Sequence, residues 1–322
     1  MVRMWSVADY GSIDVALGIH CPGYDSKHMQ TSERQVREGH IHTPDGKVWY
    51  KKVGDDGNTP LIVLHGGPGY PHDYLESLQD LAAERQVIMY DQLGCGNSDT
   101  TTDPALWTLE HFVEELDSVV RHLELERFHI LGHSWGSALA VAFALGKPKG
   151  LSRLILSDPL ISAPLWIKDA KRLIAHLPPD MADALRTHPH DSATYREAMK
   201  EYYKCYVVRL DPVPDAFKRA KAKMNPELYA HMWGDEEYEA TGLLKDLDLS
   251  VRLFEIAVPT LVLCGRYDEA TPEACATFQS LLQNGSLAVF EESAHYPFWN
   301  ERELYMTAVS RFLQDEACQP HQ

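Results

Sequence analysis

Six short apolar segments, each followed at once by a loop of small or polar residues, constrain the fold of this 322-residue chain most strongly. Such segments are typical of parallel strands that are buried on both faces of a sheet. Helical patterns separate several of them, and this alternation predicts a doubly wound α/β sheet with right-handed crossovers. The predicted strands are a hairpin, Gln35–His42 and Lys47–Val53, followed by Leu61–Leu64, Gln86–Tyr90, Phe128–Leu131, Leu154–Leu156, Thr260–Leu263 and Leu287–Phe290. The predicted helices between them are His72–Ala83, Thr108–Leu123, Ala138–Leu145 and Pro272–Leu282.

Two parts of the chain interrupt the alternation. Residues 1–35 lack clear periodicity, and we interpret them as an N-terminal arm. Residues 160–250 contain no convincing strand but are rich in helix formers, with a predicted helix at Ala193–Val208. This segment lies between two consecutive strands of the predicted core, so we predict a helical cap inserted over the edge of the sheet where ligands bind. The core would then comprise residues 36–159 and 251–322.

The charge and cysteine content exclude several classes of function. The chain has 30 Lys and Arg against 47 Asp and Glu, a formal net charge of −17, which argues against nucleic acid or an anionic membrane as partner. No apolar window approaches the roughly 20 residues that span a bilayer. The six cysteines form no C-x-x-C pair and are expected to be reduced thiols of a cytoplasmic protein. A functional role for Cys95, which lies in a glycine-rich loop, stays open.

The segment Gly132–Gly136, of sequence G-H-S-W-G, predicts a catalytic nucleophile at Ser134. It follows the predicted strand Phe128–Leu131 and opens a helix, which is the context that a G-x-S-x-G nucleophile elbow requires. The small residues two positions on either side of Ser134 let the strand and the helix pass closely. The serine hydroxyl is thereby pushed out of the sheet.

A serine hydroxyl is a weak nucleophile and needs a general base that is oriented by an acid. In this architecture the partners follow the serine in the order acid, then histidine. Asp268 comes just after one strand of the same sheet edge and His295 just after the next, so we predict Asp268 as the acid and His295 as the base. Glu269 and Asp158 are rival candidates for the acid.

The glycine-rich loop His65–Gly69 is expected to supply donors for the oxyanion that forms during acyl transfer. We predict the backbone N–H groups of Gly67 and Trp135 as the oxyanion hole, and Gly66 as a substrate contact. Nucleotide binding by these glycines is disfavoured because no P-loop lysine and no G-x-G-x-x-G pattern is present. The side chains of Trp135 and Phe298 are candidates for an apolar slot in the site.

No metal or cofactor is predicted. The closely spaced histidines His188 and His190 suit an exposed polar loop better than a metal site, because no further cluster of histidine or cysteine adjoins them.

Taken together, these motifs resemble the prolyl iminopeptidase family of α/β-hydrolases. His65–Gly69, Asp91–Ser98, Gly132–Ser137 and Gly265–Asp268 stand in the family's order, and the likeness covers Val36–Leu313. The chain is most similar to the branch of the tricorn-interacting aminopeptidase and the L-amino acid amidases. The resemblance implies an α/β-hydrolase fold and hydrolysis of the amide or peptide bond after a free N-terminal amino acid, often proline.

The resemblance also implies that acidic residues of the cap hold the free α-amino group of the substrate. Trp233–Tyr238 and Thr241–Asp248 resemble that branch, and Glu237 matches its glutamate before the aromatic residue. Asp211 falls where close relatives carry a second acid, often glutamate, so its shorter side chain departs from the family's pattern. Tyr203 is expected to line the same pocket. From the residues alone, a turn-capping Asp211 and a solvent-facing Glu237 stay open.

The leading hypothesis is therefore a cytoplasmic serine hydrolase that works through an acyl-enzyme without a cofactor. Its substrate would be a small molecule or short peptide with a free α-amino group, and homo-oligomerisation stays open. An alternative is a hydrolase whose cap has been repurposed for an ester, a lactone or a specialised metabolite. A ligand-binding receptor on this fold is disfavoured, because such a protein has no need of a complete triad.

Overall fold

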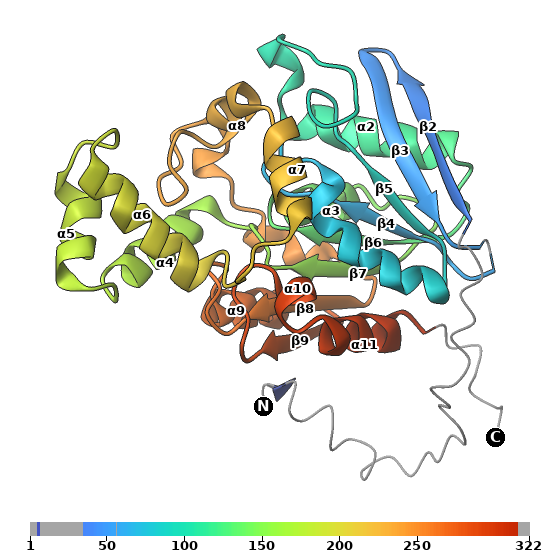
Figure 1. Ribbon diagram of the computed structural model, residues 1–322. Coiled ribbons are helices and arrows are strands. Elements are labelled where there is room, and N and C mark those ends of the chain that lie inside the picture. Colours follow the sequence, from blue (N-terminus) through green and yellow to red (C-terminus); the bar gives the residue numbers. More distant parts are fainter. Residues whose placement is uncertain (1–4, 7–34, 56, 315–322) are drawn as a thin grey trace.

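The computed structural model describes residues 5–6, 35–55 and 57–314, and these form one mixed sheet covered by helices on both faces (Figure 1). The nine strands lie in the order β1-β9-β8-β7-β6-β4-β5-β3-β2. Along this order, every pair of neighbouring strands between β1 and β5 is parallel. Only the last two pairs, β5–β3 and β3–β2, are antiparallel. The strands are β1 (Trp5–Ser6), β2 (Val36–Thr43), β3 (Gly46–Val53), β4 (Leu61–Leu64), β5 (Val87–Tyr90), β6 (Phe128–His133), β7 (Leu151–Ser157), β8 (Thr260–Gly265) and β9 (Gly285–Phe290). The predicted α/β class and mostly parallel sheet are confirmed.

The helices of the core form two layers, one on each face of the sheet. On one side lie α2 (Leu109–His122), α3 (Trp135–Leu145) and α9 (Pro272–Leu281), together with the 3₁₀ segment η5 (Ser250–Glu255). On the other side lie the 3₁₀ segment η2 (His72–Ala83) and the helix α11 (Arg302–Leu313), which is preceded by the short helix α10 (Pro297–Asn300). A short 3₁₀ turn, η3 (Pro104–Leu106), precedes α2.

Strand β4 shows why the sheet needs both layers. All four of its residues are buried, and successive side chains of a strand point to opposite faces. Ile62 and Leu64 pack in the apolar cluster that includes Leu139 of α3, whereas Leu61 and Val63 pack in the cluster that includes Leu78 of η2. A strand that is apolar on both faces is stable only between two layers of helices.

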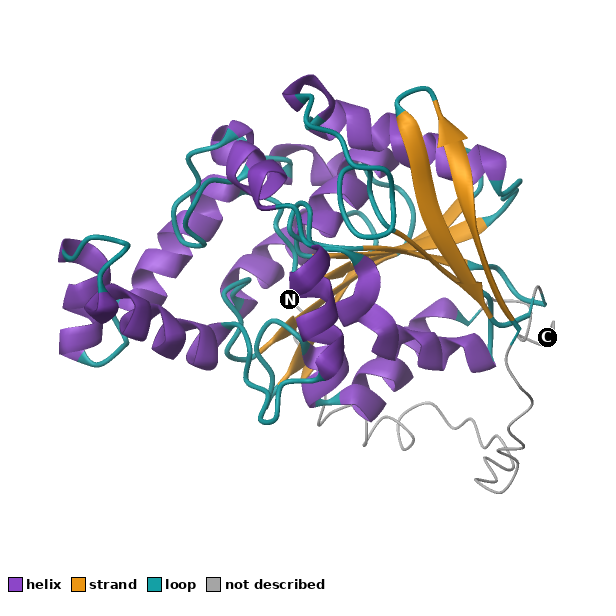
Figure 2. Ribbon diagram, turned by 45° about the horizontal axis from the view of Figure 1, so that its top comes forward, coloured by secondary structure: helices purple, strands orange, loops and turns teal. Residues whose placement is uncertain are grey.

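Between the neighbouring strands β7 and β8 the chain makes a long helical excursion, which projects beyond the edge of the sheet (Figure 2). Its elements are α4 (Ala163–Ile174), α5 (Pro179–Thr187), α6 (Ala193–Tyr206), α7 (Asp215–Lys223), α8 (Pro226–Met232) and the 3₁₀ turn η4 (Leu243–Asp246). Helices α4, α5 and α6 share a small apolar core of their own, which includes Ile174, Leu185 and Tyr202. We call residues 160–250 the helical excursion below; they correspond to the segment predicted as a cap.

The predicted N-terminal arm, residues 1–35, lies outside the described residues except for β1 and Gln35. Within the described ranges, no helix combines the length and apolar character that crossing a membrane requires.

Candidate active site

Ser134 occupies a sharp turn between β6 and α3. Its backbone angles are φ 54° and ψ −121°, a region that non-glycine residues rarely adopt. The neighbouring glycines are required by close packing: a Cβ at Gly132 would lie 2.2 Å from the carbonyl oxygen of Gly136, and one at Gly136 would lie 2.3 Å from that of Leu64. The N–H of Ser134 donates to the carbonyl of Ser157 on the adjacent strand over 3.0 Å, which fixes the turn to the sheet.

Asp268 and His295 meet at the ends of β8 and β9. Nδ1 of His295 lies 2.7 Å from Oδ1 of Asp268, and both side chains are buried. The same Oδ1 accepts the N–H of Ala270 over 3.0 Å, which anchors the carboxylate. A carboxylate that accepts from Nδ1 leaves Nε2 of His295 as the nitrogen available to a serine hydroxyl. Ser134 and His295 line the same cavity, so the structure brings all three predicted residues to one edge of the sheet.

The loop that carries Gly66 and Gly67 lies directly against this turn. A Cβ at Gly66 would stand 3.1 Å from Cβ of Ser134, so only glycine allows the approach without displacement. Gly67 has φ +110°, a left-handed conformation that favours glycine. Trp135 is the first residue of α3, and the N–H groups of a first helical turn have no acceptor within the helix. The amides predicted as an oxyanion hole are therefore both near Ser134.

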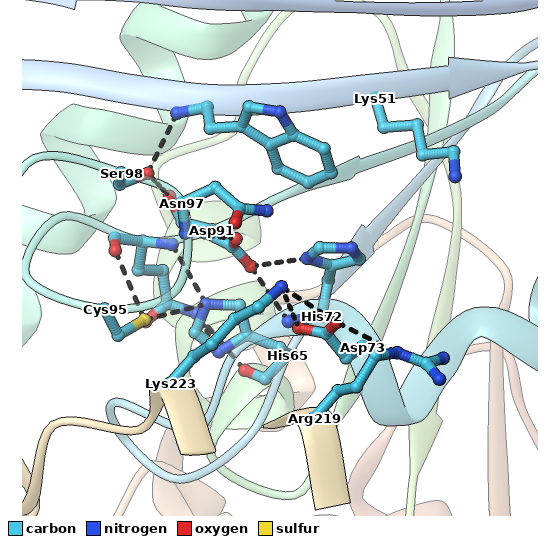
Figure 3. Close-up of polar contacts among 12 residues, drawn as sticks. Lys51, His65, His72, Asp73, Asp91, Cys95, Asn97, Ser98, Arg219 and Lys223 are labelled. Atoms are coloured by element: carbon cyan, nitrogen blue, oxygen red, sulfur yellow. Dashed lines mark hydrogen bonds and ion pairs between the residues drawn. The ribbon is translucent and has the colours of Figure 1, made fainter. Parts of the chain in front are cut away.

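A buried polar network supports the glycine loop from behind (Figure 3). Nε2 of His65 accepts the N–H of Gln92 over 2.9 Å, while Nδ1 faces the carbonyl of Gly66 at 3.0 Å. Burial lowers the pKa of His65, so the ring is neutral and uses one nitrogen as acceptor and the other as donor. Oδ1 of Asp91 lies 2.7 Å from Nδ1 of His72; burial opposes ionisation, but hydrogen bonds from His72 hold the pKa of Asp91 below its ordinary value.

Cys95 belongs to this network and not to the reacting groups. Its Sγ lies 3.7 Å from Nε2 of His65 and donates to the carbonyl of Gln92 over 3.3 Å. Burial raises the pKa of the thiol well above its usual value, so it is a neutral thiol with a structural role.

Ion pairs join the helical excursion to the core beside this network. The buried carboxylate of Asp73, on η2, lies 3.0 Å from Nζ of Lys223 and 3.6 Å from Nε of Arg219, and both cations come from α7 (Figure 3). Arg219 also pairs with the partly exposed Glu76. These contacts hold α7 against η2.

The cavity has a volume of about 660 Å³ and is lined by residues of the core and of the helical excursion. Gly66, Gly67, Ser134 and His295 contribute the core side, and the excursion contributes the opposite wall. Its lining includes the aromatic side chains of Tyr70, Tyr74, Phe217, Tyr229 and Tyr296. The predicted apolar slot of Trp135 and Phe298 is wrong, because both side chains are fully buried in the core and do not line the cavity.

Four acidic residues line the cavity, Asp235, Glu236, Glu237 and Glu269, and two of them are candidates to bind a cation. Oε2 of Glu237 accepts the hydroxyls of Tyr203 and Tyr229, each over 3.0 Å, and all three residues line the cavity. The second is Glu269, which is buried and accepts the hydroxyl of Tyr202 over 3.0 Å. Burial, followed by the nearby Glu237 and Asp268, raises the pKa of Glu269 well above its ordinary value. A cation in the cavity would relieve this concentration of negative charge.

Asp211, the predicted second acid, lies elsewhere. It is exposed to solvent between α6 and α7 and is not among the residues that line the cavity. Glu269, in contrast, lines the cavity. Its position next to Asp268 in the sequence marks it only as a rival for the acid of the triad.

Comparisons with known proteins identify the fold and the family. Residues 59–302 match the family model described as alpha/beta hydrolase fold. The chain is 42% identical over 282 residues to a proline iminopeptidase of Heyndrickxia coagulans, covering 86% of this chain and 98% of that protein. Among solved structures, it matches the proline iminopeptidase of Mycobacterium smegmatis (34% identity, TM-score 0.82, 86% of this chain and 97% of that one). It also matches VinJ (34% identity, TM-score 0.83, 86% and 98%).

Proposed function

The chain belongs to the proline iminopeptidase family of α/β-hydrolases and is a peptidase-type hydrolase, and from this premise we propose that it releases a free N-terminal amino acid from a short peptide or amino acid amide. One observation carries the proposal: Ser134 and His295 share a cavity with Glu237 and Glu269. A nucleophile beside a pair of carboxylates suits a substrate whose scissile carbonyl is close to an ammonium group.

In the proposed mechanism Ser134 attacks the carbonyl carbon while Nε2 of His295 takes the hydroxyl proton. Asp268 orients His295 and stabilises the imidazolium that forms. The N–H groups of Gly67 and Trp135 stabilise the oxyanion, and collapse of the tetrahedral intermediate gives an acyl-enzyme as His295 returns the proton to the leaving amine. Water activated by His295 then hydrolyses the ester and releases the amino acid.

Recognition of the α-amino group is assigned to Glu237 and Glu269. The tyrosine hydroxyls that donate to both carboxylates fix their positions before the substrate arrives, and this reduces the reorganisation that binding requires. An ammonium between them forms charge-assisted hydrogen bonds in a cavity that is partly open to solvent. The aromatic lining provides apolar surface for a compact side chain such as proline.

We also propose a cytoplasmic location. The four cysteines in the described ranges, Cys95, Cys205, Cys264 and Cys275, are free thiols. Cys264 and Cys275 are close enough for a hydrogen bond between the thiols, and both are buried without forming a disulfide. Free thiols of this kind support residence in a reducing compartment.

The test is a set of matched substrates: prolinamide, alaninamide and Pro-Gly-Gly, each with a free and with an acetylated amino group. The proposal predicts cleavage of the free forms and loss of cleavage on acetylation. The ratio of amide to peptide hydrolysis then separates an amidase from an aminopeptidase. Equal cleavage of both forms, or cleavage of simple esters and lactones alone, would contradict the proposal and favour a repurposed site.

A further inference from the structure

A second aspartate lies behind the pair formed by Asp268 and His295. Asp158 follows β7, its side chain is fully buried, and its backbone has φ 51°, a left-handed conformation that costs energy outside glycine. Its N–H donates to the carbonyl of Leu263 on β8 over 2.7 Å, which holds this conformation in place. One carboxylate oxygen of Asp158, one of Asp268 and one ring nitrogen of His295 all lie within 4.8 Å of one another. The mechanism described above gives Asp158 no role.

The charges around the two carboxyls do not support two ionised groups. In the described part of the chain, Asp268 pairs with His295, and Asp158 pairs only with His133, whose Nε2 lies 3.7 Å away. Burial lowers the pKa of His133 well below its ordinary value, so this ring is neutral. Its Nε2 donates instead to the carbonyl of His295 over 2.9 Å, while Nδ1 faces the hydroxyl of Tyr74 at 2.8 Å. Among the described residues, the other titratable groups near the pair carry no positive charge; they are Tyr74, Cys264, Glu269, Cys275 and Tyr305.

Each of the two carboxyl groups has one oxygen that accepts hydrogen bonds and one oxygen that has no donor among the residues that the structure describes. Oδ1 of Asp268 accepts from His295 and from the N–H of Ala270. Oδ2 of Asp158 accepts the hydroxyl of Ser157 over 2.6 Å, and that hydroxyl in turn accepts from Tyr305 over 2.9 Å. Within the described residues, Oδ2 of Asp268 and Oδ1 of Asp158 are buried and without a partner as acceptors. The two side chains are within hydrogen-bonding reach of each other, so a single proton between these atoms satisfies both.

We propose that Asp158 is a positioning residue: it is a neutral carboxylic acid whose O–H donates to Oδ2 of Asp268 and thereby holds Oδ1 of Asp268 against Nδ1 of His295. This inference rests on the proposed function only in taking Ser134, His295 and Asp268 as the reacting group. Burial, followed by the proximity of Asp268, raises the pKa of Asp158 well above its ordinary value, in agreement with the geometry.

The test compares Asp158→Asn with Asp158→Ala in the full-length protein. Asparagine keeps an N–H donor for Asp268 and an acceptor for Ser157, whereas alanine removes both. The readout is the rate at which a fluorophosphonate probe labels Ser134 across a pH series, because it reports serine reactivity without depending on the natural substrate. If labelling is normal but amino acid amides are not cleaved, the substrate assignment fails and the role of Asp158 is still decided.

For Asp158→Asn we expect a labelling rate within about threefold of wild type and an acid-side midpoint that moves by less than about half a pH unit, since no charge is removed. For Asp158→Ala we expect a loss on the order of 10–100-fold, the range seen when the partner that orients a reactive side chain is removed. A midpoint that falls by half a unit or more in Asp158→Asn would overturn the proposal, because it would reveal an ionised Asp158. An unchanged rate in Asp158→Ala would overturn it as well.

An infrared measurement keeps the proposal testable if the alanine variant does not fold. At neutral pH the difference spectrum of wild type minus Asp158→Asn should contain the C=O stretch of a protonated, buried carboxylic acid. A difference spectrum with only carboxylate bands would overturn the assignment of the proton.

Discussion

The N–H of Gly66 donates to the hydroxyl of Tyr74 over 2.7 Å. That hydroxyl also lies 2.8 Å from Nδ1 of His133, the residue before the nucleophile, so the glycine loop and the turn at Ser134 are joined through one phenol. Within the described part of the chain the amide of Gly67 has no such partner. Of the two neighbouring glycines, Gly67 is therefore the one whose N–H is available to an oxyanion.

Gly67→Ala should lower kcat/KM by about 10²–10³-fold, the usual effect of losing one oxyanion donor. The new Cβ would lie 2.6 Å from the backbone nitrogen of Tyr70, and φ +110° is unfavourable for alanine, so the loop must move away from Ser134. Steady-state kinetics on prolinamide check this. Gly57→Ala is the matched control because a Cβ there meets nothing within 4 Å, and it should behave as wild type. Equal activity of the two variants would refute the assignment.

Ser134→Ala should lower kcat by at least about 10⁴-fold, because the nucleophile of a triad cannot be replaced by a neighbouring group. The melting temperature should change little, since Ser134 is only partly buried. Ser137→Ala serves as a comparison: its hydroxyl donates to the carbonyl of Gly132, and its loss should cost stability but not chemistry. Retention of substantial activity in Ser134→Ala would show that another residue attacks the substrate.

Glu237→Gln and Glu269→Gln should each lower kcat/KM for free-amine substrates by about 10–100-fold. This corresponds to about 1.5–3 kcal/mol for a hydrogen bond to a charged group. Both variants keep the size of the side chain and an acceptor oxygen for the tyrosine hydroxyls. Asp211→Asn is the matched control, because Asp211 is exposed and outside the cavity, and it should retain wild-type kinetics. The opposite pattern, with Asp211→Asn impaired and the glutamate variants normal, would return the amine site to Asp211.

The buried carboxyl group of Glu115, on α2, should make the free energy of unfolding depend on pH. Burial raises its pKa to about 8, although the N–H of Leu93 donates to its Oε2 over 2.9 Å. The folded state therefore holds this proton more tightly than the unfolded chain, where the pKa is near 4.5. The stability that it contributes is complete below about pH 4.5 and is lost as the pH rises through about 8.

Glu115→Gln should consequently stabilise the protein at pH 8 relative to wild type, by several kcal/mol at most, and have a smaller effect at pH 5. Urea unfolding of both proteins at the two pH values measures this, and comparing the proteins at each pH cancels the other titrating groups. An equal effect at pH 5 and pH 8 would show that Glu115 is not neutral in the folded state.

The sequence predicts the central strands well, because a strand that is buried on both faces is a short continuous run of apolar residues. Leu61–Leu64 is the strand β4 without change, and the predicted helix His72–Ala83 is the 3₁₀ segment η2. Helix α3 begins at Trp135, three residues before the predicted start at Ala138, because the G-x-S-x-G pattern predicts a turn that extends to Gly136. Strand β7 begins three residues earlier than predicted, at Leu151, because its first residues are only partly buried and lack the apolar pattern.

Within the site, the order of the motifs along the chain was enough to select Asp268 and His295, since parallel strands bring their ends to one edge. The wall built by the helical excursion was harder to predict. Which side chains of that segment face the cavity depends on how α7 docks on η2, through contacts such as Asp73 with Lys223 that are 150 residues apart in sequence. The sequence alone does not show that Asp211, which the family resemblance suggests, lies outside the cavity, or that Glu269, on the loop after β8, lines it.

The most direct test of the proposed function is protection of Ser134 against a fluorophosphonate probe, followed by peptide mapping. We expect one labelled peptide, the one that contains Ser134, with slower labelling in the presence of prolinamide and no protection by N-acetylprolinamide. That result would join the nucleophile to recognition of the free amino group in one experiment. Labelling at another residue, or equal protection by the two amides, would contradict it.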